Sequence, residues 1–135
     1  MEPSAGSRRL LLVDDEILLA QLLEKYLTRL GYIVEACSDP RTAWLRFQAQ
    51  PDSYAAVLAD VEMPGMSGEE LLGQMLRLYP RLRMVVMSGC PFDVARLPAS
   101  GENIVFLQKP FLPKMLAETL KEFLDRPETP PSGAV

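Results

Sequence analysis

The stretch LLLVDDE, residues 10–16, joins a buried strand to an unfavourable group of charges. Its four consecutive aliphatic residues, Leu10–Val13, are typical of a strand that is covered on both faces. Three acids follow at once: Asp14, Asp15 and Glu16. Neighbouring carboxylates repel one another, and acids at the edge of a core lose favourable hydration. We therefore expect a ligand or a chemical function that requires these acids.

The composition indicates a single globular domain. The chain has 135 residues, 48% of them hydrophobic and 24% charged, and a net charge of −4. An acidic chain offers no basic surface to nucleic acid, so we expect no direct nucleic-acid partner. Its early apolar run is too short for a signal sequence or a membrane span, so we expect no membrane segment and a cytoplasmic protein. Residues 1–7 are expected to be a flexible leader, 8–125 the domain and 126–135 a disordered tail.

The chain contains no histidine, which limits the chemistry that it can perform. A histidine-based catalytic triad, a histidine-rich zinc site and a phosphohistidine on this chain are all excluded. The two cysteines, Cys37 and Cys90, form no CxxC pair and indicate no disulfide framework. Any chemistry must therefore use carboxylates, hydroxyls, lysine or the backbone.

Apolar strands alternate with amphipathic helices along the chain. Strands are predicted at 10–13, 33–37, 54–59, 84–87 and 104–107. Helices are predicted at 16–30, from Pro40 to about 48, after a capping box at Ser67, and from Pro113 onward. This alternation predicts an α/β fold whose parallel sheet is covered on both faces. Between 90 and 103, two prolines leave room for only a short helix.

Polar side chains stand where the predicted strands end. In open parallel sheets, ligands bind beyond the carboxyl ends of the strands. The residues at those ends are Asp14, Asp15, Asp60, Ser88 and Lys109. Each also has a simpler structural interpretation, because an aspartate can cap a helix, a serine can open a turn and a lysine can be solvated.

Taken together, these residues predict a metal-assisted phosphoryl transfer. Three carboxylates about 5 Å apart repel by roughly 3 kcal/mol per pair at an effective dielectric near 20, which a divalent cation would relieve. Oxygen ligands alone favour Mg²⁺ or Mn²⁺. Such a cation beside an aspartate favours phosphoryl transfer onto that carboxylate, for which Lys109 supplies charge and Ser88 a hydroxyl. Gly65 and Gly68 would keep the loop after Asp60 compact.

Four motifs together resemble the receiver domain of two-component response regulators. They are LLLVDDE (10–16), VLADVEMPGMSGEEL (57–71), VVMSG (85–89) and FLQKPF (106–111), and their order and spacing are specific. The resemblance implies a flavodoxin-like (βα)₅ single domain with a five-stranded parallel sheet of order 2-1-3-4-5 and helices on both faces. Gln108 and a fourth helix interrupted by prolines resemble the corresponding features of receivers of the hybrid histidine kinase type.

The resemblance also implies roles for individual residues. Asp60 is expected to be the phosphoacceptor. Asp14 and Asp15, with Asp60 and the backbone carbonyl of Glu62, are expected to hold Mg²⁺. Contacts to the phosphoryl group are expected from Ser88 and Lys109.

A switch is expected to read out the phosphate. As Ser88 is drawn toward the phosphoryl group, Phe106 would turn into the space that the hydroxyl leaves. The signal would emerge on the family's 4-5-5 face, made of residues 92–97, the fifth strand and the last helix. The resemblance further implies a cis bond between Lys109 and Pro110.

The expected function is that of a phosphoacceptor module in a phosphorelay, with a partner histidine kinase or histidine phosphotransfer protein as donor. The module is not an enzyme beyond its own phosphorylation and dephosphorylation, and it either stands alone or belongs to a larger chain such as a hybrid histidine kinase. One alternative is a Mg²⁺-dependent phosphatase with an aspartate nucleophile, although that class usually has a second aspartate where this chain has Glu62. Another is a receiver-like protein that binds a partner without being phosphorylated.

Overall fold

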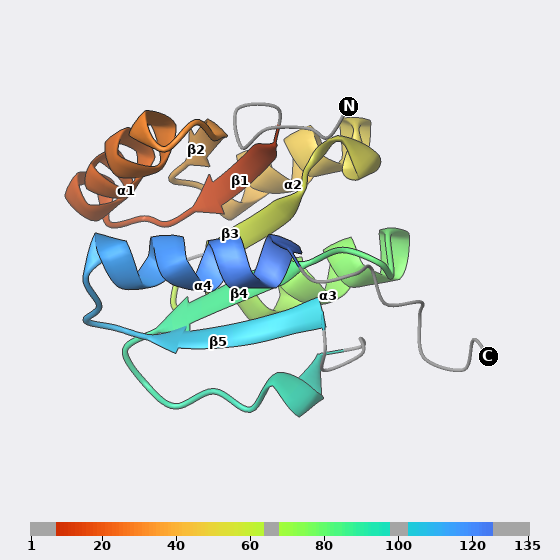
Figure 1. Ribbon diagram of the computed structural model, residues 1–135. Coiled ribbons are helices and arrows are strands. Elements are labelled where there is room, and N and C mark those ends of the chain that lie inside the picture. Colours follow the sequence, from red (N-terminus) through yellow and green to blue (C-terminus); the bar gives the residue numbers. More distant parts are fainter. Residues whose placement is uncertain (1–7, 64–67, 98–102, 126–135) are drawn as a thin grey trace.

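The computed structural model describes residues 8–63, 68–97 and 103–125. Five parallel strands form one sheet in the order β2-β1-β3-β4-β5 (Figure 1), as predicted. The strands are β1 (Arg9–Val13), β2 (Ile33–Cys37), β3 (Ala56–Asp60), β4 (Met84–Ser88) and β5 (Ile104–Gln108). Because every strand is parallel, the carboxyl ends of all five lie at the same edge of the sheet.

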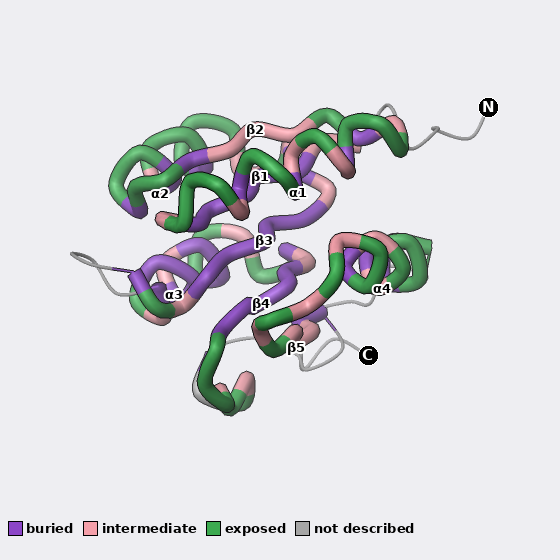
Figure 2. The backbone as a smooth tube through the Cα atoms, turned by 90° about the vertical axis from the view of Figure 1, so that its left-hand side faces the viewer, coloured by how far each residue is buried: buried purple, intermediate pink, exposed green. Residues whose placement is uncertain are grey.

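Helices cover both faces of the sheet. They are α1 (Ile17–Arg29), α2 (Pro40–Ala49), α3 (Gly68–Leu78) and α4 (Pro113–Asp125), with a short 3₁₀ helix η2 (Pro51–Ser53) before β3. On one face α1 and α4 share a core that includes Leu23 and Leu120, and on the other α2 and α3 share a core that includes Phe47 and Met75. Figure 2 shows that β1, β3 and β4 are buried in the middle of the sheet. Burial on both faces explains why these strands are continuous apolar runs.

Local signals in the sequence fix several helix ends. Asp39 is the N-cap of α2, where its carboxylate accepts a hydrogen bond of 3.0 Å from the amide of Thr42, and Pro40 occupies the first helical position. Gly31 follows α1 with a φ of 103°, a conformation that other residues rarely adopt. Gly31 therefore ends α1 before β2 begins, and Asp39 starts α2 after β2 ends.

The connection between β4 and β5 departs from the (βα)₅ pattern. Its described part contains a single short 3₁₀ helix, η3 (Val94–Arg96), so the described chain has four α-helices. Pro91 opens this segment, and Asp93 caps η3 by accepting a hydrogen bond from the amide of Ala95. The expectation of a short or irregular fourth helix is therefore confirmed in the described part of this segment.

Some sequence expectations lie outside the described residues. They are the leader at 1–7, the tail at 126–135, Gly65, and the capping box that begins at Ser67. Among the helices that the structure does describe, none is both long and apolar enough to cross a membrane.

Candidate functional site

Three aspartates meet at the carboxyl edge of the sheet. Asp14 and Asp15 follow β1 and Asp60 ends β3, and the pairing of Val13 with Ala59 places these strand ends side by side. One carboxylate oxygen of each aspartate lies within 4.8 Å of the others. Asp14 and Asp60 are buried, and Asp15 is half-buried. The predicted cluster of carboxylates is thus present.

Helix capping does not account for these aspartates. The N-cap of α1 is Glu16, whose side chain makes no capping hydrogen bond. Asp14 instead accepts a 2.9 Å hydrogen bond from the amide of Glu16, and Asp60 accepts one of 2.7 Å from the amide of Glu62. Both bonds hold a carboxylate in a fixed orientation within its own turn.

Lys109 joins the acids across the sheet edge. Its Nζ lies 2.9 Å from Oδ2 of Asp14 and 2.8 Å from Oδ2 of Asp60, and it also pairs with Glu16. The lysine side chain is only 13% exposed, so the interpretation as a solvated lysine is wrong. Burial disfavours its charged form, but the hydrogen bonds to Asp60, Glu16 and Asp14 outweigh this effect and raise its pKa. The amine is therefore a fixed positive charge beside Asp60.

One amine does not neutralise the surrounding acids. Burial raises the pKa of Asp14, even though hydrogen bonds from Glu16 and Lys109 act in the opposite direction. The donor atoms are all oxygens, and two of the three aspartates, Asp15 and Asp60, line an open cleft of about 530 Å³ together with Lys109. An excess of carboxylates in a solvent-accessible cleft fits a hard divalent cation such as Mg²⁺ or Mn²⁺.

Ser88 contributes its hydroxyl from the end of β4. The buried hydroxyl donates a hydrogen bond of 2.5 Å to Oε1 of Glu62, and the amide of Gly89 donates to the same oxygen at 2.8 Å. These bonds hold the pKa of the Glu62 carboxyl below its usual range. The Ser88 oxygen also accepts a 3.0 Å bond from the amide of Cys90, so its turn-forming role is confirmed as well.

Gly68 brings α3 against the backbone that follows Asp60. A Cβ atom at this position would lie 2.4 Å from the Cα of Val61 and 2.6 Å from the carbonyl oxygen of Asp60. Neither of these backbone atoms can move without shifting the end of β3. The absence of a side chain at Gly68 is therefore required for the positions of both α3 and Asp60.

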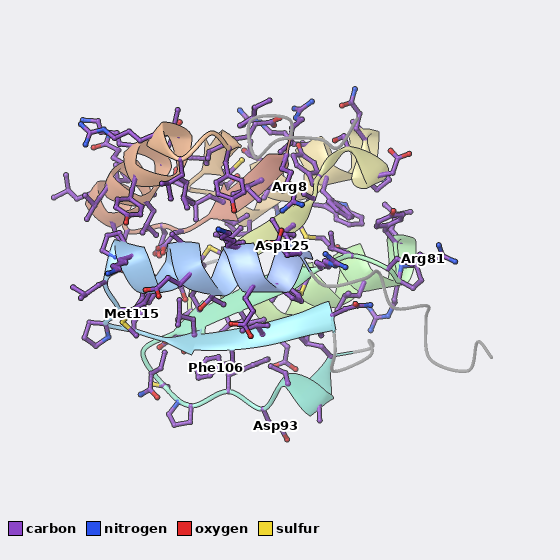
Figure 3. All side chains as sticks on the ribbon, viewed as in Figure 1. Arg8, Arg81, Asp93, Phe106, Met115 and Asp125 are labelled. Carbon is purple, nitrogen blue, oxygen red and sulfur yellow. The ribbon has the colours of Figure 1, made fainter. Side chains whose placement is uncertain are left out.

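Phe106 lies on the same face of the sheet as Ser88. It pairs with Val86 on the adjacent strand, two residues before Ser88. The ring is partly buried against the core on the α2 and α3 face, and Figure 3 places it beneath β5, beside the segment that carries Asp93. Phe106 and Ser88 thus lie on one face of adjacent strands, and the switch between them stays a prediction. The bond between Lys109 and Pro110 is cis, as the resemblance implies.

Two acidic side chains make contacts in the site that the sequence did not predict. Glu16 pairs with Lys109, and the side chain of Glu62, whose backbone carbonyl alone was assigned, reaches Ser88. The position of Glu16 directly after the two aspartates was a signal for the first. Nothing in the sequence indicates the second contact, because it depends on how two loops approach each other.

A second cleft, of about 350 Å³, lies at the opposite edge of the sheet. Arginines line it, but they also support the last helix: Arg83 donates hydrogen bonds to the carbonyls of Phe123 and Leu124, and Arg8 pairs with Asp125 at 3.4 Å. Figure 3 shows Arg8 beside Asp125 at this edge. The carboxylate cluster is therefore the candidate functional site.

Comparison with known proteins identifies the family. The sequence model of the response regulator receiver domain family matches residues 10–121 of this chain. The chain belongs to this family of two-component signalling domains. The matched region contains the aspartate cluster, Ser88 and Lys109.

Individual relatives agree with this assignment. The sensor kinase CckA of Brucella abortus is 32% identical over 124 residues, which are 90% of this chain but 13% of that kinase. The solved CheY-like receiver of Methanospirillum hungatei has 25% identity and a TM-score of 0.78 and covers 87% of this chain and 94% of its own. The solved receiver of the hybrid histidine kinase CckA has 26% identity and a TM-score of 0.74 over 87% of this chain and 99% of its own. The chain spans only 13% of the length of the Brucella kinase.

Proposed function

We propose that this receiver domain accepts a phosphoryl group on Asp60 from a phosphohistidine of a partner protein, with Mg²⁺ bound by the aspartate cluster. The observation that carries this proposal is the position of Lys109, whose amine contacts Asp60 and Asp14 at 2.8 and 2.9 Å inside an otherwise acidic site. Receivers as a family accept phosphoryl groups from histidine kinases or phosphotransfer proteins.

The transfer places new charge beside groups that can stabilise it. A carboxylate oxygen of Asp60 attacks the phosphorus, the bond between phosphorus and the donor imidazole nitrogen breaks, and the imidazole leaves. The charge on the transferred phosphoryl group is spread over its oxygens, so a fixed cation and hydrogen-bond donors lower the barrier. Lys109 supplies the cation, and the hydroxyl of Ser88 and the amide of Gly89 lie at the end of the neighbouring strand.

The acidic side chains are suited to hold the cation. Asp14, Asp15 and Asp60 each offer an oxygen, and the backbone carbonyl of Glu62 is the further protein ligand that we assign. When bound, Mg²⁺ neutralises charge on the reacting oxygens. Its presence also relieves the repulsion among the carboxylates that Lys109 leaves uncompensated.

The readout that we propose runs from Ser88 to Phe106. If Ser88 moves toward a phosphoryl group, the half-buried ring of Phe106 can enter the volume beside β4. The signal would then appear on the 4-5-5 face, formed here by residues 92–97, β5 and α4. Because the described part of the connection between β4 and β5 contains η3 and no regular helix, we expect a loop rearrangement there.

The likeness to CckA supports a place for this chain in a hybrid histidine kinase or a similar cytoplasmic phosphorelay.

One experiment separates the proposed function from the two alternatives. The chain is incubated with Mg²⁺ and acetyl phosphate, and its intact mass is recorded. The proposal predicts the mass of one added phosphoryl group, a phosphatase predicts turnover of added phosphomonoesters, and a partner-binding protein without phosphorylation predicts neither.

A further inference from the structure

The side chain of Glu62 links the loop after β3 to the end of β4. Its Oε1 atom accepts hydrogen bonds from the Ser88 hydroxyl at 2.5 Å and from the Gly89 amide at 2.8 Å. Its Oε2 atom lies 3.7 Å from the thiol sulfur of Cys90, in hydrogen-bonding geometry. A hydroxyl and a backbone amide that converge on one anionic oxygen are the donors that also bind a phosphoryl oxygen. An internal carboxylate therefore holds the groups that a phosphoryl group requires.

The same donors cannot serve both anions. A serine hydroxyl has one proton to donate, so Ser88 cannot donate to Glu62 and to a phosphoryl oxygen at the same time. The two anions would also share one cleft, which Asp60, Glu62, Gly89 and Lys109 all line. Glu62 stands two residues after Asp60, and its own amide is bonded to the Asp60 carboxylate at 2.7 Å. A phosphoryl group on Asp60 would thus meet the Glu62 carboxylate at close range.

We propose that the Glu62 carboxylate is an internal competitor of the phosphoryl group: it holds Ser88 and Gly89 in the unphosphorylated protein and leaves them when Asp60 is phosphorylated. This inference rests on the proposed function of Asp60. Glu62 is a positioning residue, because it acts through Ser88 and Gly89. Its departure frees the chain at Cys90, where the segment that leads to η3 begins. The competition opposes phosphoryl binding and couples it to residues 90–97.

The test compares the affinity of side-chain variants for beryllofluoride, which resembles a phosphoryl group, in the presence of Mg²⁺. Glu62→Ala removes the competing carboxylate and should bind beryllofluoride about tenfold more tightly, the effect of one charge-assisted hydrogen bond. Glu62→Gln keeps the shape with a weaker, neutral acceptor and should give a smaller gain in the same direction. Both variants keep the backbone carbonyl assigned to the metal, and Glu62 is exposed, so the fold should tolerate them.

Two controls test whether the effect of Glu62 on beryllofluoride affinity acts through Ser88 and Gly89. Glu118→Gln removes one negative charge from an exposed position on α4 and should leave the beryllofluoride affinity unchanged. In a Ser88→Ala background, the gain from Glu62→Ala should shrink, because one of the two contested donors is gone. In the metal-free protein, Glu62→Ala should also speed hydrogen exchange of the Gly89 amide, a readout that needs no phosphoryl mimic.

The outcomes separate the inference from the function on which it rests. If the unsubstituted chain binds beryllofluoride but both Glu62 variants bind it equally or more weakly, the competition is refuted and the proposed function stands. If the unsubstituted chain neither binds beryllofluoride nor takes up phosphate, the proposed function fails and the competition fails with it. Tighter binding by both variants, together with a smaller gain in the Ser88→Ala background, supports the inference.

Discussion

The Nζ atom of Lys109 lies 2.8 Å from Oδ2 of Asp60, although the two residues are 49 positions apart in the chain. The same amine contacts Asp14, so it compensates two buried carboxylates at once. Lys109→Met keeps most of the side-chain volume but leaves these acids without their cation. We expect the metal-free variant to lose about 2 kcal/mol of unfolding free energy, measured by urea titration with Trp44 fluorescence, and Mg²⁺ to restore part of that loss.

The pH dependence of this loss of unfolding free energy tests whether the charge of Lys109 causes it. The pKa of Lys109 is raised in the folded state, so its stabilisation is fully present below its unfolded pKa of about 10.4. It is lost as the pH rises from there through the folded pKa. The difference in unfolding free energy between the unsubstituted chain and Lys109→Met should therefore be constant from pH 7 to about 10 and shrink above it. A difference that grows at alkaline pH would contradict this account of the amine.

Asp15 offers a test of the proposed metal site, because it is the least buried aspartate of the cluster. Asp15→Ala should weaken Mg²⁺ binding, measured by calorimetry, since the site loses one of its few protein ligands. It should also raise the melting temperature of the metal-free protein, because one source of carboxylate repulsion is gone. For the unsubstituted chain, Mg²⁺ at tenfold its dissociation constant should add about 1.4 kcal/mol. An unchanged Mg²⁺ affinity in Asp15→Ala would exclude Asp15 from the site.

Gly68 and Gly73 form a matched pair at the start and in the middle of α3. At Gly68 a methyl group would overlap the backbone of Val61 and Asp60, so Gly68→Ala should cost about 2 kcal/mol and disturb Mg²⁺ binding. At Gly73 the nearest atom to an added methyl group is the Arg77 guanidinium at 3.6 Å, so Gly73→Ala should stabilise the protein by about 0.5–1 kcal/mol. Equal effects at both positions would refute the role given to Gly68.

Coupling between Ser88 and Phe106 can be followed by amide hydrogen exchange. With Mg²⁺ and beryllofluoride, we expect altered protection in residues 88–97 and 103–112 as well as around Asp60. Phe106→Ala removes the ring that would fill the space beside β4 and should confine the change to the site. If protection in the unsubstituted chain changes only around Asp60, the predicted switch is absent from this protein.

The sequence predicted the sheet well because its signals are local. A run such as Leu10–Val13 is typical of a strand that is buried on both faces, and the cap at Asp39 and the stop at Gly31 lie within one turn of the helix ends that they mark. The ends of β1 and β3 could be placed together because a parallel sheet fixes their common edge.

Contacts between side chains of separate loops could not be derived in the same way. The bond from Ser88 to Glu62 joins residues that are 26 positions apart, and it depends on the rotamers of both. The residues that Lys109 contacts could not be predicted for the same reason, because a lysine at a strand end can equally well be solvated. The short η3 follows from Pro91 only in part, because proline excludes a regular helix without specifying what replaces it.

Phosphorylation of Asp60 tests the central claim most directly. The unsubstituted chain, Asp60→Asn and the exposed-site control Asp52→Asn are incubated with acetyl phosphate and Mg²⁺, and each intact mass is measured. The amide of Asp60→Asn cannot form an acyl phosphate, so we expect one added phosphoryl group on the unsubstituted chain and on the control and none on Asp60→Asn, all three being equally folded. Undiminished labelling of Asp60→Asn would show that another residue accepts the phosphate and would contradict the account.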